Sequence, residues 1–183
     1  MERTDMAAKR ILPGDRSLSH EQERMIRVNQ AGEFGAIQIY KGQLAVLKGK
    51  ECEPVIQHML EQEHEHLDKF NKLMIERRIR PTLLAPLWNV AGYAVGAATA
   101  ALGEKAAMAC TVAVEEVIDQ HYAEQEKELG DTDKNLKSLI SKCREEENEH
   151  KEIGLSYGPT PYPILSMFIK TAAKSAIWLS KRV

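Results

Sequence analysis

The sequence predicts an all-α protein built around a four-helix bundle. Glycine, proline and small polar clusters divide the 183 residues into six segments with helical periodicity. No segment shows the sustained alternation of polar and apolar residues that is typical of a strand. A chain of this length holds one domain with a sizeable core. We expect this single domain over residues 19–183, preceded by a flexible N-terminal extension over residues 1–18.

The first pair of helices is expected at about residues 19–48 and from residue 54 to just before Pro81. Ser19 is a suitable N-cap, and Gln22 follows three residues later as its capping-box partner. Pro54 is favoured in a first helical turn, whereas Pro81 disfavours helical geometry in the residue before it.

Four further helices are expected. A strongly apolar one covers about residues 83–102 and is ended by Gly103, and the next covers about residues 104–129. After a turn at residues 130–133, the fifth helix runs to about residue 153 and is closed by Gly154, and the last runs over about 163–181. The four long helices form the bundle, the apolar helix connects its halves, and an additional amphipathic helix follows. This order of connections is ferritin-like.

Charge and cysteine content exclude several classes of protein. The chain has 25 basic and 27 acidic residues, so we expect no nucleic acid as a partner. Its three cysteines form no Cys-x-x-Cys pair, which favours a reducing compartment. The first 15 residues mix acids and bases without an apolar core, so they predict neither a secretory signal nor a transit peptide.

The two halves of the chain repeat one pattern of ionisable residues. Each half has a glutamate with a tyrosine seven positions later, and then a Glu-x-x-His motif. The members are Glu33, Tyr40, Glu63 and His66 in the first half and Glu115, Tyr122, Glu147 and His150 in the second. The two glutamates of a half are 30 residues apart in the first (33 to 63) and 32 apart in the second (115 to 147). The halves therefore look like copies of one helix pair.

Each of these four glutamates lies in an apolar stripe of its helix, as Glu63 does between Leu60 and Leu67. Four ionised carboxylates in an apolar interior repel one another and are costly to bury. No lysine or arginine occupies the stripes at this level, whereas two divalent cations would balance the four negative charges. A metal-free bundle core held by salt bridges is the alternative.

The pattern of one glutamate from each of two helices and a Glu-x-x-His pair from each of the other two is that of a di-iron or di-manganese carboxylate site. Oxygen-rich ligands with one imidazole per metal suit iron or manganese better than a structural zinc. We therefore expect two metal ions. The predicted ligands are Glu33, Glu63, His66, Glu115, Glu147 and His150.

Other residues near the stripes have more than one interpretation. Tyr40 and Tyr122 are either core aromatics whose hydroxyls reach the carboxylates or participants in proton or electron transfer. His121 either bonds a ligand, gates access to the site, or is an ordinary surface histidine. Glu116 falls away from the stripe centre, which favours Glu115 as the ligand.

Four segments resemble one family: "RVNQAGEFGA", "RPTLLAPLWNVAGYAVG", "AMACTVAVEE" and "EENEHKEIGL". From about Arg24 to Val183 the chain is similar to the demethoxyubiquinone hydroxylases of ubiquinone biosynthesis. The resemblance implies a membrane-associated di-iron monooxygenase that uses O2 to hydroxylate the ring of a polyprenyl demethoxyquinone. It also implies that Glu63 and Glu147 bridge the two irons and that NADH is the ultimate reductant, directly or through the bound quinone.

The resemblance further implies a peripheral position on the cytoplasmic face of a bacterial inner membrane or the matrix face of a mitochondrial one, and it allows a homo-oligomer or a ubiquinone-biosynthesis complex. Residues 83–103 carry no charge and could span a bilayer by length alone. A crossing there would separate the two halves of the ligand set. We therefore expect this segment to lie in the membrane interface or to pack beside an apolar substrate channel, with core or oligomer packing as the alternative.

Other functions for a metal-binding bundle are a ferroxidase or iron-storage protein and a rubrerythrin-like peroxidase. A storage bundle predicts a hydrophilic exterior, which the apolar third and last helices contradict. A rubrerythrin-like protein would carry a Cys-x-x-Cys tail, which this sequence lacks. The last helix is basic as well as apolar, a pattern typical of membrane-surface helices.

Overall fold

A computed structural model describes residues 18–158 and 162–183, and the extension predicted for residues 1–18 lies almost wholly outside this range. The described residues form six α-helices and no strand, which confirms the all-α prediction. The helices are α1 (Leu18–Leu47), α2 (Glu53–Arg77), α3 (Ala85–Ala101), α4 (Glu104–Leu129), α5 (Lys134–Ser156) and α6 (Pro163–Ser180).

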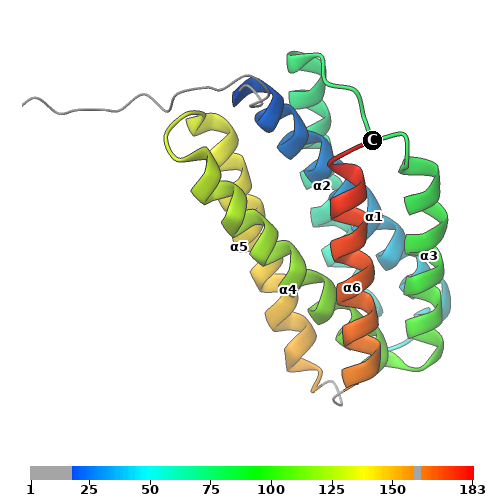
Figure 1. The fold of residues 1–183 in the computed structure, drawn as a ribbon. Helices are drawn as coiled ribbons and strands as arrows, with labels where there is room; N and C mark the ends of the chain where they lie inside the picture. The colour runs from blue at the N-terminus through cyan, green and yellow to red at the C-terminus, as the bar shows by residue number, and fades with distance from the viewer. Residues whose placement is uncertain (1–17, 159–161) are drawn as a thin grey trace, which may run out of the picture.

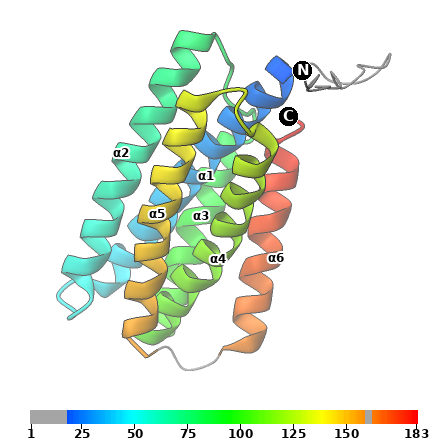
Figure 2. The same ribbon diagram turned by 90° about the vertical axis from the view of Figure 1, so that its left-hand side faces the viewer.

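Two helical hairpins make the bundle (Figures 1 and 2). Helix α1 pairs with α2, and α4 pairs with α5, while α1 faces α4 and α2 faces α5 at a wider separation. Helix α3 lies along α1, and α6 lies along α4. The backbones of α3 and α6 do not approach each other closely within the described residues, and a strip of α1 and α4 lies between them. Side chains join the two helices at one point, where Trp88 Nε1 of α3 donates to Ser180 Oγ of α6 at 3.0 Å.

Glycines bring α3 and α1 together backbone to backbone. A Cβ atom added to Gly96 would lie 2.0 Å from the carbonyl oxygen of Ile39. One added to Gly42 would lie 2.2 Å from the carbonyl oxygen of Tyr93, and one added to Gly92 would lie 2.9 Å from the carbonyl oxygen of Gly35. Only glycine permits such an approach, so these positions fix where the apolar helix lies.

Helix α2 ends earlier than predicted. Arg78 adopts a left-handed conformation with φ 55°, and its N–H donates to the carbonyl oxygen of Ile75 at 3.2 Å. This αL cap stops the helix at Arg77, although Pro81 alone would have allowed three more residues.

Helix α1 begins at Leu18, one residue before the predicted start. Ser19 therefore lies inside the helix and is not the N-cap that the sequence predicted.

Gly154 is not a helix stop, contrary to the sequence prediction. Helix α5 continues to Ser156, and Gly154 is buried inside it. An added Cβ at this position would lie 2.8 Å from Cγ2 of Val112, so the glycine serves the close contact between α5 and α4. The chain leaves the helix at Tyr157 and Gly158, and Gly158 has a positive φ of 55°.

One small cluster of buried apolar residues, which includes Val114 and Ile169, lies where α6 packs on α4. Within the bundle there are two larger clusters: one contains Ile26, Phe70, Leu136 and Ile140, and the other contains Ile37, Ile56, Met59 and Met108, among other residues. Along each of the four bundle helices, the glutamates of the repeated pattern lie between members of these clusters or at their border. The layer formed by these four glutamates is thus enclosed at both ends by packed apolar side chains.

Candidate metal centre

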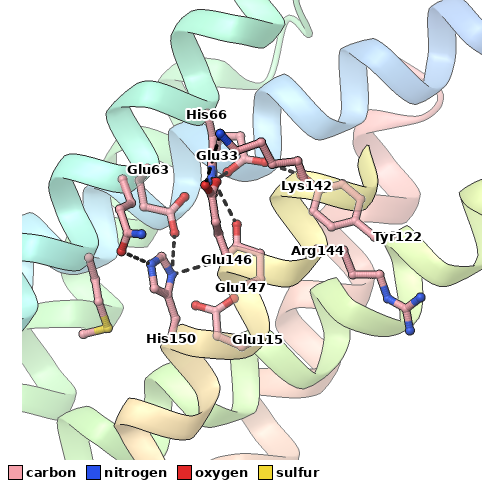
Figure 3. A network of polar contacts seen from close by, with 12 residues as sticks. Glu33, Glu63, His66, Glu115, Tyr122, Lys142, Arg144, Glu146, Glu147 and His150 are labelled. Atoms are coloured by element: carbon pink, nitrogen blue, oxygen red, sulfur yellow. Dashed lines mark hydrogen bonds and ion pairs between the residues drawn. The ribbon is translucent and has the colours of Figure 1, made fainter. Parts of the chain in front are cut away.

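The structure brings all six predicted ligands together at the middle of the bundle (Figure 3). They form two overlapping groups, and within each group one ligand atom of every residue lies within 4.8 Å of the others. The groups are Glu33, Glu63, His66 and Glu147, and Glu63, Glu115, Glu147 and His150. Their exposures are between 0% and 3%. The glutamates of the two Glu-x-x-His motifs, and no other residues, belong to both groups of four.

Both histidines present Nδ1 to this cluster. His66 Nδ1 lies 3.2 Å from Glu147 Oε1 and 3.5 Å from Glu33 Oε2. His150 Nδ1 lies 3.0 Å from Glu147 Oε2 and 3.3 Å from Glu63 Oε1. Each imidazole therefore faces carboxylates that come from both halves of the chain.

Several buried polar atoms of the cluster lack hydrogen-bond partners within the described residues. They include both carboxylate oxygens of Glu63 and Nδ1 of His66. Unpartnered polar atoms in an apolar interior cost free energy that a native protein rarely tolerates. These atoms, on oxygen-rich groups with one imidazole each, are those that two iron or manganese ions would contact, so the residues fit a two-metal centre.

Burial and mutual repulsion perturb the carboxylates unequally. Burial raises the pKa of Glu63 and of Glu115 well above the usual range, and the charge of Glu147 raises both further. Burial also opposes ionisation of Glu147, but its close contacts with His150 and His66 outweigh burial and lower this pKa to about 2. In the metal-free protein, protons on Glu63 and Glu115 relieve part of the repulsion.

The two tyrosines of the repeat bond across the bundle. Tyr40 donates its hydroxyl hydrogen to Glu115 Oε1 at 3.1 Å, and Tyr122 donates to Glu33 Oε1. Burial, followed by the neighbouring carboxylates, raises the pKa of both hydroxyls, so they stay protonated donors. The prediction that these hydroxyls reach the carboxylates is confirmed, and their part in proton or electron transfer stays a prediction.

His121 is buried beside the cluster, so its interpretation as a surface histidine is wrong. It lines the same small pocket as Glu33 and Glu115, and its Nε2 lies 2.9 Å from the amide nitrogen of Gln125. Burial and the positive charge of Lys181 lower its pKa to about 3, which keeps the ring neutral.

A pair of buried amides near His121 was not identified from the sequence. Gln125 and Asn29 exchange two hydrogen bonds of 2.8 and 2.9 Å. The available signal was spacing, because Asn29 precedes Glu33 by one helical turn and Gln125 follows His121 by one turn.

Glu116 lies outside the centre, as the stripe predicted. Its side chain is 41% exposed and forms an ion pair with Lys170 of α6. Within the first Glu-x-x-His motif, Glu65 and His64 are exposed, whereas Glu63 and His66 are buried.

Outer hydrogen bonds to the two histidines were also missed by the sequence analysis. His66 Nε2 lies 2.5 Å from Glu146 Oε2, and His150 Nε2 lies 3.0 Å from Gln62 Oε1. These contacts orient both rings from their outer nitrogens, Nε2 of His66 and Nε2 of His150.

An apolar groove runs beside the centre, between α3 and α6, with α1 and α4 as its floor. Its cavity volume is 160 Å³. The groove and the pocket that reaches the carboxylates share five lining residues: Val28, Gly32, Ala36, Ile118 and Ile177. The groove therefore adjoins the centre through small and branched side chains.

Helices α3 and α6 also expose large apolar side chains. They are Leu87, Val90 and Tyr93 on α3, with Leu83 and Leu102 just outside it, and Ile164, Met167, Phe168 and Trp178 on α6. Among the helices of the described residues, none combines the length and the hydropathy needed to cross a bilayer.

The fold and the site define a class: ferritin-like helical bundles with an internal layer of carboxylates and histidines. Residues 20–180 match the family described as "Ubiquinone biosynthesis protein COQ7", and the chain belongs to this family. The resemblance found in the sequence is thereby confirmed.

Relatives are similar over most of their length. A 3-demethoxyubiquinol 3-hydroxylase of Rhodospirillum rubrum is 54% identical over 176 residues, which cover 94% of this chain and 83% of the relative. The NADPH-dependent 3-demethoxyubiquinone 3-hydroxylase, mitochondrial, of Homo sapiens is 50% identical over 168 residues, covering 88% and 77%. The 5-demethoxyubiquinone hydroxylase, mitochondrial, of Saccharomyces cerevisiae is 41% identical over 181 residues, covering 88% and 78%.

Proposed function

We propose that the protein is an O2-dependent di-iron monooxygenase that hydroxylates the ring of demethoxyubiquinone, or of its quinol, in ubiquinone biosynthesis. The observation that carries this proposal is the buried cluster of four carboxylates and two imidazoles, in a chain about half identical to proteins named as such hydroxylases. The apolar groove that adjoins the cluster supports a hydrophobic substrate and counts against iron storage.

In this proposal Glu33 and His66 would hold one iron, and Glu115 and His150 would hold the other. Glu63 and Glu147 would be shared by both ions, because only they belong to both groups of four that could surround a metal. When bound, the two irons supply the reduction and cleavage of O2. The overall balance is one ring C–H, one O2, two electrons and two protons, giving one C–OH and one water.

The chain's own residues position the reactants. The ring of the substrate enters through the groove and reaches the centre past Gly32 and Ala36. His121, which burial keeps neutral, offers a polar contact to a quinone oxygen in the pocket it shares with Glu33. The hydroxyl of Tyr40 orients the Glu115 carboxylate, and the hydroxyl of Tyr122 orients the Glu33 carboxylate.

The two electrons come from an external donor. The sequence has no Gly-x-Gly-x-x-Gly fingerprint. NADH as the donor stays a prediction, and the names of the human and Dictyostelium discoideum relatives specify NADPH for those proteins.

A polyprenyl substrate resides in a bilayer, so we propose that the exposed apolar surfaces of α3 and α6 rest on a membrane. Arg182 lies 3.8 Å from the ring centre of Trp178, which places a cation next to an aromatic ring suited to the headgroup region. In bacteria this would be the cytoplasmic face of the inner membrane, and in mitochondria the matrix face. A homo-oligomer or a biosynthetic complex stays a prediction.

The test uses Glu63→Ala and Glu147→Ala, with the exposed Glu65→Ala as the matched control. Each protein is loaded anaerobically with Fe2+ and then given O2, a reductant and a demethoxyquinone. We expect the wild type and the control to bind two irons and release hydroxylated quinone, and both bridging variants to lose iron and product. Normal iron content and product in the bridging variants would refute the site, whereas two irons without product would favour the ferroxidase alternative.

A further inference from the structure

The two histidines of the repeat have outer partners of different charge. His66 Nε2 donates its hydrogen to the carboxylate of Glu146 at 2.5 Å, whereas His150 Nε2 donates to the amide oxygen of Gln62 at 3.0 Å. Figure 3 shows Glu146 and His66 side by side above the level of His150. The inner nitrogens of both rings face Glu147, and each also has a second carboxylate nearby, Glu33 for His66 and Glu63 for His150. Both inner sides thus meet carboxylates, whereas only one outer partner is charged.

This difference is a substitution within an otherwise symmetric arrangement. Gln62 immediately precedes Glu63, and Glu146 immediately precedes Glu147. Each residue of this pair contacts the histidine of the opposite half. The two halves thus exchange equivalent outer contacts, but one partner carries a negative charge and the other is neutral.

Two lysines hold the Glu146 carboxylate in place. Lys142 Nζ lies 3.5 Å from Oε1, and Lys69 Nζ lies 3.9 Å from Oε2. The much shorter contact of this carboxylate, at 2.5 Å, is the one with His66 Nε2, and the Glu146 side chain is 22% exposed.

An imidazole can donate its outer N–H to a carboxylate or to a neutral amide. The carboxylate makes the opposite ring nitrogen the stronger electron donor of the two cases. Loss of such outer partners typically weakens metal binding by about 10–100-fold. We propose that Glu146 and Gln62 make the two metal positions unequal, with the ion beside Glu33 and His66 held more tightly than the ion beside Glu115 and His150. The inference rests on the proposed two-metal centre.

The test is an anaerobic titration of the full chain with Fe2+ against a competing chelator. For the wild type we expect two binding steps separated by about tenfold or more in Kd. Glu146→Gln keeps a hydrogen-bond acceptor but removes its charge, so the tighter step should weaken by about tenfold. Gln62→Glu should instead tighten the weaker step. Glu145→Gln removes the same charge from an exposed position of α5 and should leave both steps unchanged.

The double variant Gln62→Glu/Glu146→Gln moves the charged partner to the other histidine. With one equivalent of iron, anomalous X-ray scattering should place the metal beside Glu33 and His66 in the wild type, and beside Glu115 and His150 in the double variant. General structural damage would weaken binding but would not exchange the occupied position.

Three outcomes would overturn the inference. If two irons bind with equal affinity in the wild type, or if Glu146→Gln leaves both steps unchanged, the inference fails while the two-metal centre stands. If the wild type fails to bind two irons, both the inference and the proposed centre fail.

Discussion

Glu63 lies at the centre of the carboxylate cluster, and neither of its oxygens has a hydrogen bond within the described residues. Its environment shows what sequence reasoning at the residue scale could and could not reach. Its inward direction followed from the apolar stripe around it, and so did that of Glu147. The outer partners Gln62 and Glu146 could not be inferred in the same way, because partly exposed polar residues carry no periodic signal and their contacts depend on how the hairpins face each other.

Replacing Glu63 with glutamine should stabilise the metal-free protein while abolishing iron binding. The amide is nearly isosteric and is neutral without a bound proton, whereas the buried Glu63 must take up a proton on folding at any pH above its usual pKa. At neutral pH we expect the free energy of unfolding to rise by about 1–3 kcal/mol in chemical denaturation without metal. Glu65→Gln, exposed on the same helix, is the control and should change little.

The effect of Glu63→Gln should also depend on pH. The folded-state pKa of Glu63 is raised above its usual 4.5, so the folded protein retains this proton to higher pH than the unfolded chain. The stability that the proton provides is present below about pH 4.5 and is lost as pH rises through the raised pKa. The advantage of the glutamine variant should therefore be small in acid and grow toward neutral pH. An advantage that is constant over this range would contradict the assignment.

At the scale of elements, the six helices were predictable because glycine, proline and apolar periodicity mark them well. Their ends were less so. Helix α2 stops at a left-handed arginine, and Gly154 lies within α5 because α4 packs against it. A glycine in a sequence is consistent with a helix stop or with a close helix contact, and only the tertiary packing distinguishes the two.

The backbone contact between α3 and α1 predicts a severe effect of Gly96→Ala. The added methyl group would lie 2.0 Å from the carbonyl oxygen of Ile39, and backbone atoms cannot easily yield. We expect a loss of about 2–4 kcal/mol in the free energy of unfolding. Gly32→Ala is the control, because its Cβ meets no atom within 4 Å and alanine favours a helix by about 0.5–1 kcal/mol. Equal stability of the two variants would refute this packing.

At the scale of the whole molecule, large apolar side chains gather on the two helices that lie outside the bundle. The sequence placed both helices outside the four-helix bundle and kept core or oligomer packing as the alternative to a membrane surface. It left open whether α3 lies in a membrane interface or packs beside a channel. The two positions are compatible in the structure, because α3 and α6 line the groove with one side and expose apolar residues on another.

This surface predicts binding to lipid vesicles. Phe168→Glu should weaken co-sedimentation with phosphatidylcholine and phosphatidylglycerol vesicles by about tenfold, since burial of a phenylalanine contributes roughly 1.5–3 kcal/mol. Ile75→Glu is the matched control, because Ile75 is 78% exposed but lies on α2, which contacts neither α3 nor α6 closely within the described residues. If both variants bound vesicles as the wild type does, α6 would not be the membrane surface.

The central claim, that the buried cluster supports ring hydroxylation by O2, is tested most directly by isotope transfer. The iron-loaded, reduced protein is mixed with a demethoxyquinone and 18O2 in ordinary water, and the product is analysed by mass spectrometry. The proposed function predicts that the new hydroxyl group carries 18O. A hydroxylated product with oxygen from water, or no hydroxylated product from a chain that holds two irons, would contradict it.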